Sequence, residues 1–387
     1  MKAYVVGGAV RDRLLGEPVR DRDWVVVGAT PEQLVAAGYT PVGRDFPVFL
    51  HPVTHEQYAL ARTERKAGRG YHGFVFHAAP DVTLEQDLER RDLTINAIAE
   101  DPASGTLIDP FGGRRDLEQR VLRHVSPAFA DDPVRLLRLA RFAARWPQFA
   151  IADETRVLLL RLVAGGEVDA LVPERVWQEV ARGLREARPS RMIELLRAWG
   201  ALARLAPMLD AGLADAAPRH WSLRAIDAAP PPLALRFACL CHALDADGDV
   251  AGQPRLRALC EHWRVDTDSR EMALLVARER PLLQRGDAEF GPSQCLALLQ
   301  RCDAWRRPAR LADALIAIDT LAAAADEAAV KALLQRRGAL LRRALHAAGA
   351  VRVASLPAPL RAGPGEALGQ ALREARLQAI AQALARA

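Results

Sequence analysis

Two aspartates stand two residues apart in the run Asp21-Arg22-Asp23, directly before an apolar run at residues 24–27. On an extended strand, positions two apart face the same side, so both carboxylates project together. Two carboxylates held this close repel each other unless a cation lies between them, and oxygen-only ligands favour magnesium. The pair therefore predicts a binding site for Mg²⁺, and the ion would also bridge nucleotide phosphates. The alternative is a solvated turn before a strand.

A second cluster, Gly7-Gly8 followed by Arg11 and Asp12, comes after the apolar residues 3–6. Glycines at the end of a strand let the backbone approach a ligand, and the free N–H groups at the start of a helix favour a phosphate. Arg11, one helical turn inside, is placed to meet a triphosphate oxygen. The spacing fits neither the dinucleotide fingerprint nor the P-loop, and an ordinary structural turn is the alternative.

A third cluster contains Arg90, Arg91 and Asp92, followed by Thr94 and Asn96 in an apolar segment. Polar groups that enter a hydrophobic stretch need partners, and a phosphate or a sugar hydroxyl would supply them. Without further context, a helix end with ordinary ion pairs explains the same residues.

A fourth cluster combines Asp131 and Asp132 with Arg135, Arg138 and Arg141 at a spacing of three. Pro133 and the two acids suit the first turn of a helix, and the arginines then form one stripe along it. An Asp and an Arg three residues apart offer an acceptor and donors that can hydrogen-bond the edge of a base. A solvated face of salt bridges is the alternative.

Two kinds of structure must position these clusters. Up to about residue 125, short β-branched runs alternate with turns and short helices, which predicts an α+β head with a small mixed sheet. From about residue 130, apolar residues recur at spacings of three and four, which predicts an all-α body. The expected strands are residues 3–6, 24–27, 46–51, 56–62 and 121–124, and the expected head helices are residues 9–15 and 31–36, the latter capped by Thr30.

Composition predicts a folded chain, and its charge permits a polyanionic partner. The 387 residues are 50% hydrophobic and carry a formal net charge of +5, so the length allows two or three domains and excludes disorder over most of the chain. Fifty of the 53 cations are arginine, which binds phosphate through two hydrogen bonds and stacks on bases. A GC-rich genome that favours arginine codons is the alternative explanation of that bias.

The compartment is predicted from what the chain contains and lacks. It has no apolar run of about 18 residues, and its N-terminus turns to glycine and charge too early for a signal peptide, so we expect a cytoplasmic protein with no membrane association. The five cysteines show no paired spacing typical of zinc, and we expect them to be reduced and buried.

In this order and at these distances, the four clusters resemble the class II tRNA nucleotidyltransferases, the CCA-adding enzymes of the polymerase-beta-like nucleotidyltransferase superfamily. The similarity covers about the first 145 residues. It extends to the runs at residues 43–49 (GRDFPVF), 61–66 (ARTERK) and 124–129 (HVSPAF).

The resemblance implies a role for each cluster. Asp21 and Asp23 match the catalytic, metal-binding pair. The residues that match nucleotide-binding positions of the family are Gly8, Arg11, Arg91, Asp132, Arg135, Arg138 and Arg141. Among these, Arg91 falls on the motif that holds the nucleotide and its ribose, with Asp92 and Asn96 beside it. Asp132 and Arg135 match the residues that read the base edge of CTP or ATP without a nucleic-acid template.

The chain departs from the family pattern at two places. Asp131 stands where the family usually has Glu, and a shorter carboxylate keeps the charge, so we expect a small effect. His242-Ala243 stands where longer relatives carry the His-Asp pair of an HD phosphohydrolase domain, and Ala243 cannot bind a metal. We therefore expect His242 to be a hydrogen-bonded core histidine, and we predict no metal phosphohydrolase activity.

The predicted function is the addition of C, C and A to the 3′ end of tRNA from CTP and ATP, with release of pyrophosphate. Residues 1–125 would form the catalytic head, residues 126–225 a helical neck for base recognition and tRNA binding, and residues 226–387 a degenerate HD-like body that binds tRNA. A poly(A) polymerase is the rival in the same superfamily, and a catalytically inactive RNA-binding module is the rival from another class.

Three further regions carry predictions. Glu64 is a candidate third carboxylate, with a surface ion pair as the alternative. Residues 67–73 are rich in glycine and are a candidate for a mobile segment in the switch from C to A. Arg306-Arg307, Arg342-Arg343 and the C-terminal tail are candidate tRNA contacts, with solvated helix faces as the alternative.

Overall fold

The computed structural model describes residues 1–42, 48–66, 74–214, 216–244, 252–284, 290–325, 328–361 and 365–385. Contacts divide the chain into two compact units. The first contains Met1–Gly183 and Arg191–Leu205, and the second contains Leu184–Ser190 and Ala206–Ala387. Every predicted site residue belongs to the first unit. The predicted boundaries near residues 125 and 225 stay predictions.

The core of the first unit is a mixed sheet with the strand order β3-β4-β5-β2-β1-β8-β9 among the described residues. Strand β2 is central, pairing antiparallel with β1 and parallel with β5. The strands of this sheet are β1 (Lys2–Val6), β2 (Asp23–Val27), β3 (Thr40–Val42), β4 (Val48–Leu50), β5 (Gln57–Leu60), β8 (Ala99–Glu100) and β9 (Leu107–Ile108). Two smaller sheets pair β6 (Thr63–Lys66) with β7 (Phe74–His77), and β10 (Val121–Leu122) with β11 (Ala150–Ile151).

Alternation along the central strands places apolar side chains on both faces of the sheet. One face packs Val6 and Val25 with Leu88, and the other packs Val26 and Leu60. The first unit's helices begin with α1 (Gly8–Leu14), α2 (Pro31–Ala36), α3 (Leu84–Glu89), the 3₁₀ turn η2 (Thr94–Asn96) and α4 (Gly113–Gln119). Thr30 caps α2 by accepting a hydrogen bond from the Gln33 N–H, and Thr83 caps α3 in the same way.

After the head, the chain of the first unit is mainly helical. Its elements are η3 (Pro127–Asp131), α5 (Val134–Arg145), α6 (Asp153–Ala164), η4 (Glu167–Ala170), α7 (Pro173–Gly183) and α9 (Ala201–Leu205), and the division between the units falls within α8 (Pro189–Ala198). Helix α5 packs against α7. Leu136, Leu139 and Ala143 bury one face of α5, which leaves its arginines on the opposite face.

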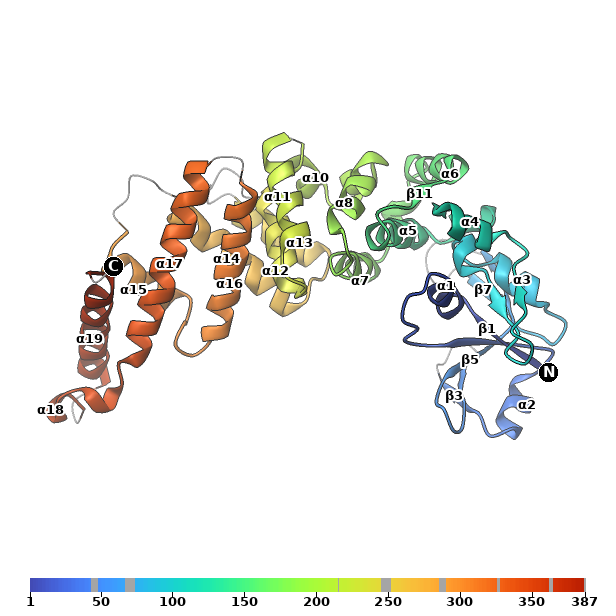
Figure 1. The fold of residues 1–387 in the computed structure, drawn as a ribbon, viewed down its shortest axis with the longest axis horizontal. Coiled ribbons are helices and arrows are strands. Elements are labelled where there is room, and N and C mark those ends of the chain that lie inside the picture. The colour runs from blue at the N-terminus through green and yellow to red at the C-terminus, as the bar shows by residue number, and fades with distance from the viewer. Residues whose placement is uncertain are drawn as a thin grey trace. The chain divides into compact units, whose positions relative to one another are not determined.

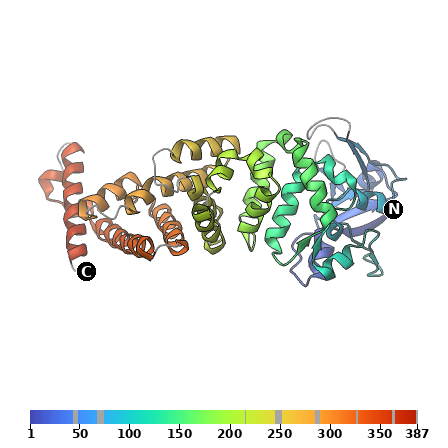
Figure 2. The same ribbon diagram turned by 90° about the horizontal axis from the view of Figure 1, so that it is seen from above.

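The described residues of the second unit form only helices and short 3₁₀ turns (Figures 1 and 2). These elements are α10 (Pro207–Gly212), α11 (Ala216–Ala228), α12 (Leu233–Cys241), η5 (His242–Leu244), α13 (Gly252–His262), α14 (Thr267–Gln284), α15 (Pro292–Arg301), α16 (Pro308–Ala324), α17 (Ala328–Ala350), η6 (Val353–Ser355), α18 (Ala358–Arg361) and α19 (Gly365–Ala385). Helix α12 packs against α14 and α16, and α17 packs against α16 and α19.

The sequence predicted this fold class correctly. The expected helix at residues 31–36 has the predicted bounds, and the expected strands at 3–6, 24–27 and 56–62 match β1, β2 and β5 to within two residues. The strands β3, β6, β7, β8, β9 and β11 were not predicted, because two to four residues are too few to show a period. The predicted mobile segment at residues 67–73 and the first part of the run at 43–49 lie outside the described residues.

The second unit tests the predictions for cysteine and for His242. All five cysteines are free and buried, as predicted. His242 is also buried, at 3% exposure, and its ring meets the Trp221 ring edge to face, with 4.3 Å between centroids. The expected hydrogen bonds are missing, because neither ring nitrogen has a partner among the described residues. Burial, with a contribution from the Arg280 charge, lowers the pKa of His242 well below its ordinary value.

Candidate active site

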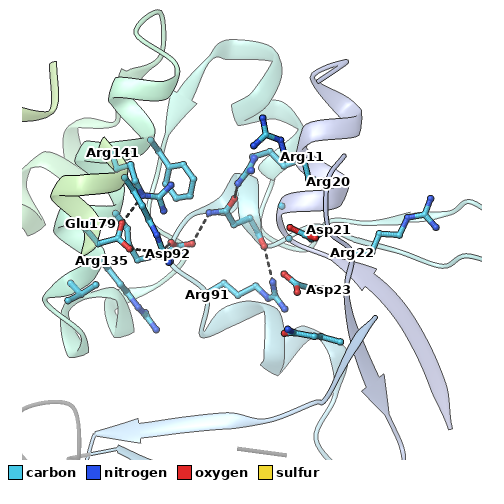
Figure 3. A pocket seen from close by; sticks show the side chains of 18 of the residues that line it. Arg11, Arg20, Asp21, Arg22, Asp23, Arg91, Asp92, Arg135, Arg141 and Glu179 are labelled. Carbon is cyan, nitrogen blue, oxygen red and sulfur yellow. Dashed lines mark hydrogen bonds and ion pairs between the residues drawn. The ribbon is translucent and has the colours of Figure 1, made fainter. Parts of the chain in front are cut away.

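A pocket of about 1300 Å³ opens in the first unit, and it gathers all of the predicted site residues. Side chains reach it from the segment before β2, from α1, from residues 90–92 after α3, and from α5 and α7 (Figure 3). The predicted residues that line it are Gly8, Arg11, Asp21, Asp23, Arg91, Asp132, Arg135, Arg138 and Arg141. Residues separated by more than 100 positions in the sequence thus share one cavity.

Asp21 and Asp23 stand at the start of β2, where Asp23 pairs with Val6 of β1. Both side chains project toward the same side of the pocket (Figure 3). Both residues are exposed, and neither carboxylate has a hydrogen bond or an ion pair within the described part of the chain. Two unpaired carboxylates two residues apart form a donor set of hard oxygens, which fits a divalent cation such as Mg²⁺.

Gly7 lies between this strand and the arginines of the pocket. Its backbone has φ 69°, and a Cβ at this position would lie 2.8 Å from Nη1 of Arg91. Its N–H donates to the Ile98 carbonyl at 3.1 Å. A side chain at position 7 would strain the backbone and displace Arg91, so this glycine is needed for close approach.

Arg11 is held on all sides before any ligand arrives. Only 5% of it is exposed, and it donates to the Asn96 side chain and, at 2.8 Å, to Asp12. Its guanidinium lies 5.2 Å from the centroid of Phe142 and 4.8 Å from that of Trp146. Burial lowers the pKa of Arg11, and the charge of Asp12 opposes that shift. Arg11 therefore lines the pocket in a fixed orientation.

Asp87 positions two adjacent arginines. Its carboxylate is fully buried, and it accepts hydrogen bonds from Arg90 at 2.8 Å and from Arg91 at 3.2 Å. Burial alone would raise the pKa of Asp87, but the charges and hydrogen bonds of Arg90 and Arg91 hold it below its ordinary value. Arg91 also donates to the Asn96 carbonyl at 3.4 Å.

Asp92 connects the third cluster to helix α5. The residue is buried and accepts from the Asn96 amide at 2.9 Å and from Nε of Arg138 at 2.7 Å. Burial would raise the pKa of Asp92, but Arg138 and Asn96 lower it far below the ordinary value. The expectation that Asp92 and Asn96 lie beside Arg91 in the site is confirmed, and Asp92 also orients Arg138.

Helix α5 presents its arginines in a stripe, and each has a defined partner. Arg135 donates to the Ala128 carbonyl at 3.0 Å and to the Arg90 carbonyl at 2.7 Å. Arg141 donates to the buried carboxylate of Glu179 on α7 at 2.7 Å. The alternative of a solvated face is wrong for these residues, because both side chains are only 11% exposed.

Asp132 stands just before α5 and has partners on two elements. Its Oδ1 accepts from the Val134 N–H at 3.2 Å, in the first turn of α5. Two nitrogens of Arg175 on α7 donate to its two oxygens, at 3.2 and 2.9 Å. Hydrogen bonds from both α5 and α7 thus hold the Asp132 carboxylate in place.

Glu64 lies in the same pocket and forms the ion pair considered as the alternative, with Arg62, but the two side chains are largely buried and the pair does not lie at the surface. Its side chain is 14% exposed and accepts from Arg62 at 3.0 Å and from Arg90 at 2.7 Å. Both arginines donate to Oε1 of Glu64, and its Oε2 lies 3.8 Å from Arg135, so Glu64 is placed to orient arginines.

Sequence reasoning missed three residues that organise the pocket: Asp87, Arg175 and Glu179. Each is a partner of a predicted site residue, and none stands next to that residue in the sequence. One signal was available, because Arg175 and Glu179 are four apart and so share a face of α7.

The mixed sheet, the carboxylate pair at the start of β2 and the arginine-lined pocket define a nucleotidyltransferase of the poly(A) polymerase head type. The family model described as "Poly A polymerase head domain" matches residues 3–123. The model described as "Probable RNA and SrmB- binding site of polymerase A" matches residues 148–213.

Similarity over the whole chain defines the family more closely. A "Multifunctional CCA protein" from Leptothrix cholodnii is 52% identical, covering 98% of this chain and 96% of the relative. One from Paracidovorax citrulli is 51% identical and covers 100% and 98%. The crystal structure of the Bacillus stearothermophilus CCA-adding enzyme in complex with CTP is 28% identical, with a TM-score of 0.63 over 98% of this chain and 88% of that one. The chain belongs to the CCA-adding tRNA nucleotidyltransferases.

No helix in the described ranges is long and apolar enough to span a bilayer.

Proposed function

We propose that this chain adds C, C and A to the 3′ end of tRNA, using CTP and ATP and releasing pyrophosphate. The observation that carries the proposal is the single pocket in which an unpaired carboxylate pair faces a set of fixed arginines. Chains about 50% identical over nearly their full length carry the name of CCA proteins, which favours this activity over a poly(A) polymerase.

In the proposed mechanism, Asp21 and Asp23 hold Mg²⁺ through their exposed oxygens. When bound, the metal supplies charge neutralisation at the phosphates and lowers the pKa of the attacking 3′ hydroxyl. The backbone at Gly8 and the guanidinium of Arg91 bind the triphosphate, and Arg11 and Arg138 add positive charge in fixed orientations. The chain thus contributes position and electrostatics, and phosphoryl transfer needs little else.

Asp132 and Arg135 are proposed to read the base. The amino groups of cytosine and adenine are donors, whereas uracil and guanine present a carbonyl at the corresponding position. A carboxylate can accept only, and a guanidinium can donate only, so the two side chains select for C and A. Arg141 completes the stripe on the same helix.

We further propose that residues 126–225 and 226–387 bind the tRNA, through phosphate contacts from an arginine-rich surface.

A transfer assay tests the activity. Purified protein with Mg²⁺ is given tRNA truncated at the discriminator base, tRNA ending in CC, or an unstructured RNA, with CTP, ATP or both. We expect three added nucleotides on the first tRNA and one adenosine on the second. Long adenosine tails on every RNA would show a poly(A) polymerase instead, and no transfer to any substrate would show an inactive binding module.

A further inference from the structure

The residue match to a probable RNA-binding region covers α7, yet one face of this helix is turned to the nucleotide pocket. Arg175 and Glu179, one turn apart, both line the pocket and both contact residues of the base-reading segment. Arg175 contacts Asp132, and Glu179 contacts Arg141.

The contact between Arg175 and Asp132 is geometrically specific. Two guanidinium nitrogens reach the two carboxylate oxygens at 3.2 and 2.9 Å, so the carboxylate plane is fixed as well as its position. The two side chains are 27% and 21% exposed, which leaves the pair open to the cavity. Each carboxylate oxygen has two acceptor sites; Oδ1 accepts from the Val134 N–H and from Arg175, whereas Oδ2 accepts from Arg175, so Oδ2 can also accept from a base.

We propose that Arg175 is a positioning residue for nucleotide selection: it fixes the Asp132 carboxylate so that an acceptor faces the amino group of cytosine or adenine. This inference rests on the proposed base-reading role of Asp132. Without Arg175, the Asp132 carboxylate could rotate and accept hydrogen bonds from water or from other bases. The site would then discriminate less between a base with an amino group and a base with a carbonyl at the same position. Helix α7 thereby serves nucleotide choice in addition to any contact with RNA.

The test measures kcat/KM for CTP and for UTP on tRNA truncated at the discriminator base. We expect R175A to lower the CTP-over-UTP ratio about tenfold, equivalent to about 1.4 kcal/mol. R175K should lie between the wild type and R175A, because one ammonium cannot hold both oxygens in a plane. R156A is the matched control, since Arg156 on α6 is exposed, pairs with Asp153 and lies outside the pocket.

A second arm makes the same comparison in a D132A background. If Arg175 acts through Asp132, R175A should not change the ratio further there. A loss of fold alone would lower activity with CTP and UTP equally and would leave the ratio unchanged. Thermal unfolding of each variant checks the fold, and R175Q replaces R175A if the latter does not fold.

The outcomes separate the two proposals. If D132A keeps the wild-type ratio, the proposed base-reading role of Asp132 is wrong. If D132A loses selection while R175A and R175Q keep it, the inference about Arg175 is wrong and the base-reading role stands.

Discussion

Two walls of the same pocket differ in whether their charged side chains form ion pairs. The helical wall is formed by residues 90–92 after α3 and by α5 and α7, and its Arg90, Arg91, Arg138 and Arg141 each have a carboxylate partner. In the strand wall, at residues 20–23, the four charged side chains are exposed and unpaired within the described chain. Charges that must keep a geometry are paired before a ligand arrives, whereas carboxylates that wait for a cation stay open.

The largest effect should come from the strand wall. D21N or D23N removes a metal-binding charge without changing the shape, and we expect transfer with CTP and with ATP to fall by at least about a thousandfold. Because both residues are exposed, the free energy of unfolding should change by no more than about 0.5 kcal/mol. Single-turnover assays and chemical denaturation measure the two quantities.

A matched control for that experiment is D153N, an exposed aspartate on α6 outside the pocket. Full activity in both single variants, D21N and D23N, would contradict the metal assignment.

The helical wall should respond in stability as well as in activity. D87A leaves Arg90 and Arg91 without the carboxylate that orients them, and we expect a loss of about 3 kcal/mol in the free energy of unfolding. The KM for both nucleotides should rise with it, since Arg91 faces the triphosphate in the proposed mechanism. Urea denaturation and initial rates check this, and an unchanged stability would mean that the buried pair is not needed to hold the wall.

A buried group without partners extends the comparison to the second unit. The folded-state pKa of His242 is lowered, so the imidazole stays neutral in the folded chain while the unfolded chain binds a proton below about pH 6.5. Well above that pH the residue costs no stability. As the pH falls below it, proton binding by the unfolded chain lowers the free energy of unfolding, by up to about 1.4 kcal/mol per pH unit.

The variant H242F should remove this loss. We expect H242F to gain on the wild type by about 1 kcal/mol in the free energy of unfolding between pH 6.5 and pH 5.5, measured by denaturation at both pH values. H346Q is the control, because His346 on α17 is exposed. Equal pH dependence in H242F and in the wild type would show that the imidazole takes up its proton without unfolding.

The smallest effect is expected at the exposed arginines of the strand wall. Arg22 points away from Asp23 in Figure 3 and has no ion pair in the described ranges. R22A should leave stability unchanged and should reduce the salt dependence of tRNA binding by about one ion. Binding at several salt concentrations measures this slope, and a slope equal to that of the wild type would place Arg22 outside the RNA contact.

The sequence predicted the residues of the pocket better than their partners. Asp21, Asp23 and the stripe from Arg135 to Arg141 could be found because their spacing follows the periods of a strand and a helix. Asp87, Arg175 and Glu179 could not be assigned, because a pair is set by how two elements pack. The sequence also predicted that His242 is buried. It could not show that the ring nitrogens lack partners, because hydrogen bonds of a buried side chain depend on how the elements pack.

The hydrogen bond from the Val134 N–H to Asp132 has an evolutionary consequence. The side chain proposed to recognise the base also satisfies a backbone group at the start of α5, so a substitution that alters base preference would also loosen the helix that carries Arg135. A substitution of Arg175 keeps the Asp132 side chain itself, so the Val134 N–H still has an acceptor at the helix start. Substitutions at Arg175 are therefore expected to change nucleotide preference at a smaller cost to the fold than substitutions at Asp132.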